Sequence, residues 1–205
     1  SGVITIRVDG REAASIAPLD APGRIDVIEV VVQPGPAFRL SSATVAPLAA
    51  GTELPAEFAI GAPAGAGVIR DAAAAGVGGW RNMGHAKAEV AGQDVVADHR
   101  ARTLSAAITL NPGPKLRFGP MTVIGAERMR ERRIIKIAGL PEGEVYSPDD
   151  LNRAAERLRR TGVFRSVTLT ESETVLAPDL LPITATVIEE KPRRYSFGAE
   201  IASFE

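Results

Sequence analysis

One phrase is written twice in this chain, and the repeat constrains the fold more than any single residue does. Residues 33–40 read QPGPAFRL and residues 111–118 read NPGPKLRF, so that Pro34 and Pro112 lie 78 positions apart. A second marker keeps the same offset, because residues 80–85 read WRNMGH and residues 158–163 read LRRTGV. Two unrelated markers at one spacing indicate tandem copies of a small module. Such an array favours an arm or a scaffold over an enzyme.

The repeat divides most of the 205 residues into three segments. Residues 1–33 are expected to be the C-terminal strand hairpin of a truncated first module, with strands over Val3–Val8 and Ile25–Val32. Residues 34–112 (the middle module) and 113–192 (the last module) are two complete copies. A module this small buries a thin core, so contacts with neighbouring segments should matter.

Composition narrows the possible partners and chemistry. The chain carries 24 basic and 25 acidic residues, for a formal net charge of −1. This balance gives no reason to expect nucleic acid or an anionic membrane as a partner. The chain has no cysteine, so disulfides, cysteine-ligated zinc and thiol nucleophiles are excluded. Hydrophobic residues make up 45% of the chain, which indicates a folded protein rather than a disordered one.

The last module has the clearer pattern of elements. We expect a strand over Arg117–Ile124, a helix over Arg128–Ala138 and a second helix after Ser147, followed by strands over Phe164–Thr170 and Ile183–Ile188. Ser147 is a good N-cap, and the proline that follows it suits the first helical position. The apolar face of the second helix has the spacing i, i+3, i+4, i+7 and consists of Leu151, Ala154, Ala155 and Leu158.

The middle module is expected to have the same β-α-α-β-β order, although its sequence pattern is less clear. At the same offset, its second helix presents Ala73, Gly76, Val77 and Trp80, so small residues should bring this helix closer to its sheet. Trp80 takes the place of Leu158 and is expected to be a core anchor. The closing strands are predicted over Ala86–Val90 and Leu104–Leu110, with a polar hairpin tip at Asp94–Arg100. The fold class is therefore α+β: tandem modules, each a three-stranded mixed sheet covered by two antiparallel helices.

Several blocks of the sequence resemble POTRA domains. Ser147-Pro148, the block Arg160-Thr161-Gly162-Val163-Phe164 and the segment 189–198, EEKPRRYSFG, are similar to the last POTRA domain of outer-membrane assembly proteins of the BamA/TamA type. The block Trp80-Arg81-x-x-Gly84-His85 resembles the preceding domain in the translocation and assembly module branch of that family.

This resemblance implies periplasmic domains of a Gram-negative outer-membrane protein. Its partners would be unfolded outer-membrane proteins or autotransporters, a large inner-membrane-anchored periplasmic protein, and the protein's own C-terminal barrel in the outer membrane. The family also places the second strand of each module at a sheet edge, where an extended client can add as a further strand. The candidate edge residues are Ala86, Lys87, Ala88, Glu89 and Val90 in the middle module, and Phe164, Arg165, Ser166, Val167, Thr168, Leu169 and Thr170 in the last.

Residues 193–205 differ in character from the rest of the chain. Tyr195 and Phe197 alternate with small and polar residues, which is typical of the first strand of a transmembrane β-barrel and equally of a soluble edge strand. Arg193 and Arg194 directly precede them. Under the family interpretation these four residues are membrane-proximal, with the aromatic rings in the interfacial belt.

A second cationic segment spans residues 127–133, where four arginines alternate with two glutamates. A solvated helix face explains this pattern, and a basic patch that faces lipid headgroups or a barrel rim is the alternative.

His85, Asp98 and His99 are the residues that invite a catalytic or metal-binding interpretation. Neighbouring residues of a strand point to opposite faces, so Asp98 and His99 cannot form a fixed pair on one face. We therefore expect a hydrogen-bonding role for His85 and a turn role for Asp98 and His99, with no catalytic residue, metal or cofactor. Two alternatives to the assembly scaffold remain: POTRA modules of a two-partner secretion transporter, and a small α+β hydrolase-like or metal enzyme around His85 and His99.

Overall fold

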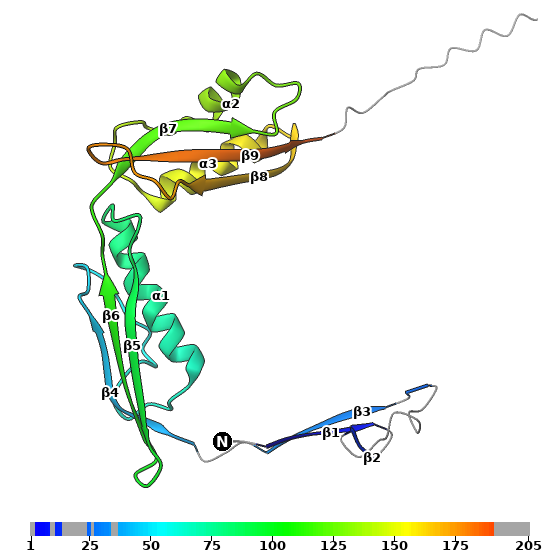
Figure 1. Ribbon diagram of the computed structural model, residues 1–205, viewed down its shortest axis with the longest axis vertical. Helices are drawn as coiled ribbons and strands as arrows, with labels where there is room; N and C mark the ends of the chain where they lie inside the picture. The colour runs from blue at the N-terminus through cyan, green and yellow to red at the C-terminus, as the bar shows by residue number, and fades with distance from the viewer. Residues whose placement is uncertain (1–2, 9–10, 14–23, 26, 34–36, 191–205) are drawn as a thin grey trace, which may run out of the picture. The chain divides into compact units, whose positions relative to one another are not determined.

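The computed structural model describes residues 3–8, 11–13, 24–25, 27–33 and 37–190 (Figure 1). Contacts divide the chain into two compact units, the first formed by residues 1–76 and 90–110 and the second by residues 77–89 and 111–205. The strands of the described residues form three sheets of three strands each. No helix among these residues is long and apolar enough to cross a membrane.

The first sheet is antiparallel and consists of β1 (Val3–Val8), β2 (Arg11–Glu12) and β3 (Ile28–Gln33), in the order β2-β1-β3. β1 has the bounds that the sequence predicts, and β3 begins three residues later than Ile25. β2 was missed, because a strand of two residues is too short to show an alternating pattern.

The middle module contains β4 (Arg39–Ala46), α1 (Ala66–Asn82), β5 (Glu89–Asp98) and β6 (Thr103–Asn111). Its sheet has the order β4-β6-β5, with β4 parallel to β6 (Figure 1). One face of α1 is buried and consists of Ile69, Ala72, Ala73 and Gly76, at the spacing i, i+3, i+4 and i+7. Leu40 and Ile108 from the sheet are 1% and 2% exposed, and they complete the hydrophobic side of this layer.

Two predictions for the middle module are wrong. Residues 47–65 contain no α-helix, so one helix and not two accompanies this sheet. Pro47, Pro55 and Pro63 interrupt any helix there, and Gly51 and Gly61 adopt positive φ angles of 76° and 85° that turn the chain. The predicted hairpin tip is also displaced, because β5 continues to Asp98 and the turn covers residues 99–102.

The close approach of α1 to its sheet is confirmed. A Cβ atom added to Gly76 would lie 2.7 Å from Leu110 Cδ1 and 3.0 Å from Val45 Cγ1. These distances are shorter than normal carbon–carbon contacts, so a side chain at position 76 would push the helix away from the strands. The small residues of this face therefore set the spacing between helix and sheet.

The last module has the full β-α-α-β-β order that the sequence predicts. Its elements are β7 (Arg117–Ile124), α2 (Glu131–Ala138), α3 (Pro148–Arg160), β8 (Phe164–Glu171) and β9 (Leu180–Glu189). β9 is the central strand, parallel to β7 and antiparallel to β8. Both helices contribute to one core, in which Ile134, Leu158 and Val187 are at most 1% exposed.

The ends of α3 form as their residues dictate. Ser147 has an extended backbone, and its hydroxyl accepts a hydrogen bond from the Asp150 amide at 3.3 Å. Pro148 is the first helical residue. Gly162 follows the helix with a φ of 67°, a left-handed conformation that glycine adopts without strain.

Candidate functional site

Among the described strands, β8 lies at an edge of the last sheet, since it pairs with β9 and with no other of these strands. Phe164 and Val167 are buried, whereas Ser166, Thr168 and Thr170 are exposed. The predicted strand over Phe164–Thr170 therefore extends one residue further and presents short polar side chains on its solvent face.

β7, the opposite edge of the same sheet, is already covered over part of its length. Phe118 donates its amide to the Glu144 carbonyl at 2.9 Å, and the Phe118 carbonyl accepts from the Gly143 amide at 2.8 Å. Pro120 has no N–H to offer, and the pairing register shifts between Phe118 and Met121. An additional strand would therefore meet a loop and a bulge at β7.

The β8 edge is less obstructed. In the part of the chain that the structure describes, no loop backbone is hydrogen-bonded to residues 164–171. One side chain does reach this strand, because the Arg159 guanidinium donates to the Val167 carbonyl at 3.0 Å. β8 has a register shift of its own between Phe164 and Ser166, so it is the more open of the two edges from Ser166 onward.

The predicted edge strand over Ala86–Val90 is only partly correct. Glu89 and Val90 begin β5, an edge strand of the middle sheet, but Ala86, Lys87 and Ala88 lie in a turn before it. The Ala88 amide donates to the His85 carbonyl at 3.0 Å. Gly84, with a φ of 98°, reverses the chain just before this turn. The strand predicted from the sequence therefore begins three residues before the observed edge strand.

The structure nevertheless brings parts of the two predicted segments together within the second unit. Residues 86–89 and the last residues of β8, Leu169, Thr170 and Glu171, line a hollow of about 450 Å³. Arg81 and Glu173 line it too. The Lys87 ammonium lies 3.6 Å from the Glu173 carboxylate across this hollow.

Arg81, Tyr146 and Glu171 form a polar cluster beside the hollow. Arg81 Nη2 donates to Tyr146 Oη at 2.6 Å and to Glu171 Oε1 at 2.5 Å, and the Tyr146 hydroxyl donates to the same carboxylate oxygen at 2.5 Å. Arg81 Nη1 also donates to the Ala86 carbonyl at 3.0 Å. Burial, together with the neighbouring Glu171 carboxylate, raises the pKa of Tyr146, so the phenol stays protonated and can donate.

Sequence reasoning missed this cluster, because Tyr146 and Glu171 lie 65 and 90 residues from Arg81. The repeat itself contained the available signal. Arg81 and Arg159 occupy the same position in the two WRNMGH/LRRTGV markers, and both guanidinium groups bond to backbone carbonyls.

His85 makes a side-chain hydrogen bond, and His99 lies in the turn between β5 and β6. His85 Nδ1 lies 2.9 Å from the Gly113 carbonyl oxygen, and its ring meets the Trp80 ring edge-on with centroids 5.0 Å apart. Asp98 accepts from the amides of Arg100 and Ala101 at 2.8 and 3.0 Å and closes the β5–β6 turn. Within the described residues, no group of three His, Cys, Asp or Glu side chains could hold a metal ion.

Trp80 is not the core anchor that its alignment with Leu158 predicts. Its side chain is only partly buried, whereas Leu158 is fully buried. The helix face that approaches the sheet is centred instead on Ala72, Ala73 and Gly76. The remaining predicted site residues, Arg193, Arg194, Tyr195 and Phe197, lie outside the residues that the structure describes.

A cationic cavity of about 1080 Å³ lies beside α2, in the second unit. Its cations are Arg128, Arg130, Arg132, Arg133 and Lys136, and its carboxylates are Glu189 and Glu190. The cationic segment predicted at residues 127–133 thus has exposed side chains, as a solvated face requires, but these side chains also surround a concave site.

Glu189 organises one wall of this cavity. Its Oε1 accepts hydrogen bonds from the backbone amides of residues 127, 128 and 129 at 3.1, 3.0 and 2.9 Å, and Oε2 accepts from Arg128 Nε at 2.8 Å. The side chain is 3% exposed. These hydrogen bonds stabilise the ionised carboxylate and lower the pKa of Glu189 to about 2, and the bond from the Met129 amide has the largest effect.

Comparison with known proteins agrees with this geometry. Residues 116–189 match the POTRA family model, described as a surface antigen variable number repeat. A crystal structure of POTRA domains 3–5 of BamA from Haemophilus influenzae aligns with 92% of this chain and 73% of its own, at 18% identity and a TM-score of 0.70. BamA from Haemophilus ducreyi lacking POTRA domains 1–3 aligns with 75% of this chain and 30% of its own, at 15% identity and a TM-score of 0.56.

These likenesses define the class of fold: an α+β array of POTRA-like modules with three-stranded mixed sheets. Within that class, the match to the POTRA family model covers all the described strands and helices of the last module. No curated protein sequence matches the chain significantly.

Proposed function

We propose that this chain belongs to the periplasmic POTRA arm of an outer-membrane protein of the Omp85 family, and that it acts without catalysis as a docking scaffold for proteins under assembly. The POTRA match of the last module and the tandem fold support this assignment. The modules are proposed to span residues 34–112 and 113–192, with residues 1–33 as the tail of a preceding module and residues 193–205 as the start of a barrel.

The accessible edge of β8 carries the proposal. A client in extended conformation would pair with β8 through main-chain hydrogen bonds, which give affinity without reading the sequence of the client. The exposed Ser166, Thr168 and Thr170 leave room for varied client side chains beside the edge. The obstructed β7 edge would direct a client to β8.

Within this family, the Trp-Arg-x-x-Gly-His block favours the translocation and assembly module branch. The clients would then be unfolded outer-membrane proteins and autotransporters, and the docking partner a large periplasmic protein anchored in the inner membrane. A two-partner secretion transporter would keep the same fold and capture one exported partner.

Site-specific crosslinking in cells tests the docking edge. A photo-crosslinking amino acid at Thr168 should capture many outer-membrane proteins, whereas the same residue at Thr122, exposed on β7, should capture few. Capture of a single secreted chain at Thr168 would instead establish the secretion-transporter alternative. Equal capture from both positions would refute the preference for β8.

A further inference from the structure

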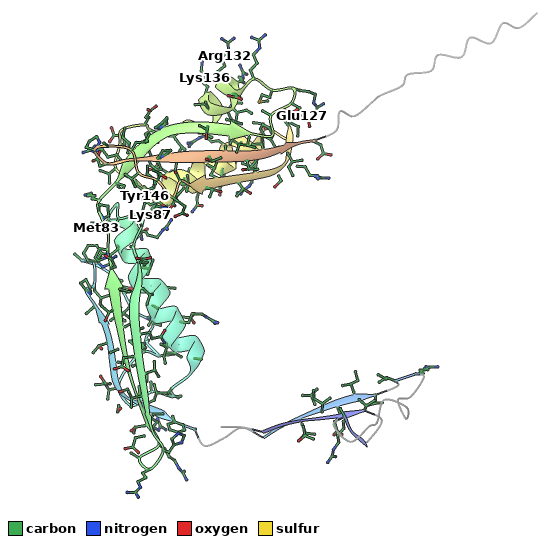
Figure 2. All side chains as sticks on the ribbon, viewed as in Figure 1. Met83, Lys87, Glu127, Arg132, Lys136 and Tyr146 are labelled. Atoms are coloured by element: carbon green, nitrogen blue, oxygen red, sulfur yellow. The ribbon has the colours of Figure 1, made fainter. Side chains whose placement is uncertain are left out.

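The cavity beside α2 concentrates positive charge that the protein itself does not neutralise. Four of its five cations, Arg130, Arg132, Arg133 and Lys136, make no ion pair or side-chain hydrogen bond with the residues that the structure describes. Figure 2 shows Arg132 and Lys136, one helical turn apart, extending from α2 away from the sheet. Unpaired cations at this density repel one another and favour an anionic ligand.

Of the two carboxylates that line the cavity, Glu189 is not available to balance these cations, so only the exposed Glu190 carboxylate faces the four of them. Glu189 already accepts three backbone amide hydrogen bonds and the Arg128 guanidinium, so its charge is engaged in holding the loop before α2. The Glu190 carbonyl also accepts from Arg128. Arg128 is therefore a structural arginine, and the other four cations form the binding surface.

The cavity wall is not purely polar. Met129 and Val163 line it together with Gly162, and Met129 is also packed against the hydrophobic core of the last module. An apolar wall below a rim of cations matches an amphiphile, whose charged group meets the rim while its apolar part contacts the wall. A fully hydrated small anion would leave this wall unused.

We propose that this cavity is a docking site for the phosphate-bearing headgroups of anionic phospholipids at a membrane surface. Arginine suits this ligand because its planar guanidinium donates two parallel hydrogen bonds to phosphate oxygens. The hollow is open to solvent, and its volume of about 1080 Å³ leaves room for a phosphate-bearing headgroup among the four cations. The formal net charge of −1 for the whole chain does not reveal this local excess of positive charge. The proposed lipid site does not depend on the proposed docking edge at β8.

Vesicle flotation with the whole 205-residue chain tests the proposal. The chain should float with phosphatidylcholine vesicles that contain phosphatidylglycerol, should not float with pure phosphatidylcholine, and should be released by salt. Each cation near an anionic surface strengthens binding about fivefold, so the double variant Arg132→Ala/Lys136→Ala should weaken vesicle affinity by roughly 25-fold.

The matched control is Arg70→Ala/Arg100→Ala, which removes two exposed cations outside the cavity. This control should bind vesicles like the unchanged chain, and circular dichroism should show all three proteins equally folded. Equal losses in both variants would mean unspecific charge attraction and would overturn the site. Unchanged binding in the cavity variant would overturn it as well.

Two competitors distinguish other sources of the same charge. Inorganic phosphate at constant ionic strength should not displace the chain from vesicles, and displacement would show a site for free phosphate instead. Polyglutamate binding that depends on Arg132 and Lys136, without any vesicle binding, would assign the cavity to an acidic protein segment and refute the lipid proposal.

Discussion

α1 of the middle module and α3 of the last module occupy equivalent positions in the repeat, but they pack against their sheets in opposite ways. At equivalent positions of the repeat, α1 has Gly76 and Trp80 where α3 has Ala154 and Leu158. α3 fills the space above its sheet with a fully buried leucine, whereas α1 removes side chains and moves its backbone toward the strands. One architecture therefore tolerates two packing solutions, provided that the spacing between helix and sheet changes with side-chain volume.

The largest expected effect comes from the filled layer. Leu158→Ala should lower the free energy of unfolding by about 2–5 kcal/mol, because it leaves a cavity among Ile134, Phe164 and Val187. Trp80→Ala should cost less, since the indole is only partly buried. Urea unfolding followed by circular dichroism compares the two variants, and a greater loss for Trp80→Ala would reverse the contrast between the helices.

The two equivalent arginines should differ next. Arg81→Ala should cost about 2 kcal/mol, because it leaves the Glu171 carboxylate, 14% exposed, without its cation. Arg159→Ala removes one hydrogen bond from an exposed arginine to the Val167 carbonyl and should cost about 0.5–1 kcal/mol. Urea unfolding measures both variants. Equal losses of unfolding free energy would show that the contacts of Arg81 with Tyr146 and Glu171 do not make Arg81 more important than Arg159.

Two glycines of α1 test the close approach directly. Gly76→Ala should destabilise the protein by about 1–3 kcal/mol through overpacking against Leu110 and Val45. Gly78→Ala is the matched control, since a Cβ there meets nothing within 4 Å. Alanine favours a helix, so the control should stabilise the protein by up to about 1 kcal/mol. Thermal melting of both variants decides the matter, and a stabilising Gly76→Ala would disprove tight packing.

The last comparison concerns Glu189, whose place in the middle module is taken by Asn111, and its effect shows in the acid dependence of stability. Folding lowers its pKa from 4.5 to about 2, so the stability it contributes is present above pH 4.5 and is lost as pH falls toward 2. Glu189→Gln should remove this part of the acid dependence of unfolding. Urea midpoints measured across that pH window check it, and an unchanged acid slope would contradict the proposed role.

Local signals explain why the last module was predicted well. The Ser147-Pro148 helix start, the apolar spacing of α3 and Gly162 act within a few residues of each other, so the sequence alone specifies them. In the middle module, three prolines and two turn glycines replace a helix that the repeat led us to expect. Similarity between copies predicted the layout of strands but not the identity of every element.

The functional surfaces were harder to predict, for a different reason. The β8 edge follows from element order, which the repeat provides. The Arg81 cluster and the α2 cavity depend on side chains that lie dozens of residues apart and meet only after folding. The arginines of residues 127–133 were visible in the sequence, but their concave arrangement and the engagement of Glu189 were not.

The central position of β9 has a mechanical consequence. Tension on the chain beyond Glu190 would pull β9 lengthwise between β7 and β8, so the hydrogen bonds on both sides would resist together in shear instead of opening one after another. Glu189, the last residue of β9, also accepts hydrogen bonds from the loop before α2. Tension on β9 would therefore act on that loop as well. This strand order therefore favours transmission of force along β9 over the successive opening of its hydrogen bonds.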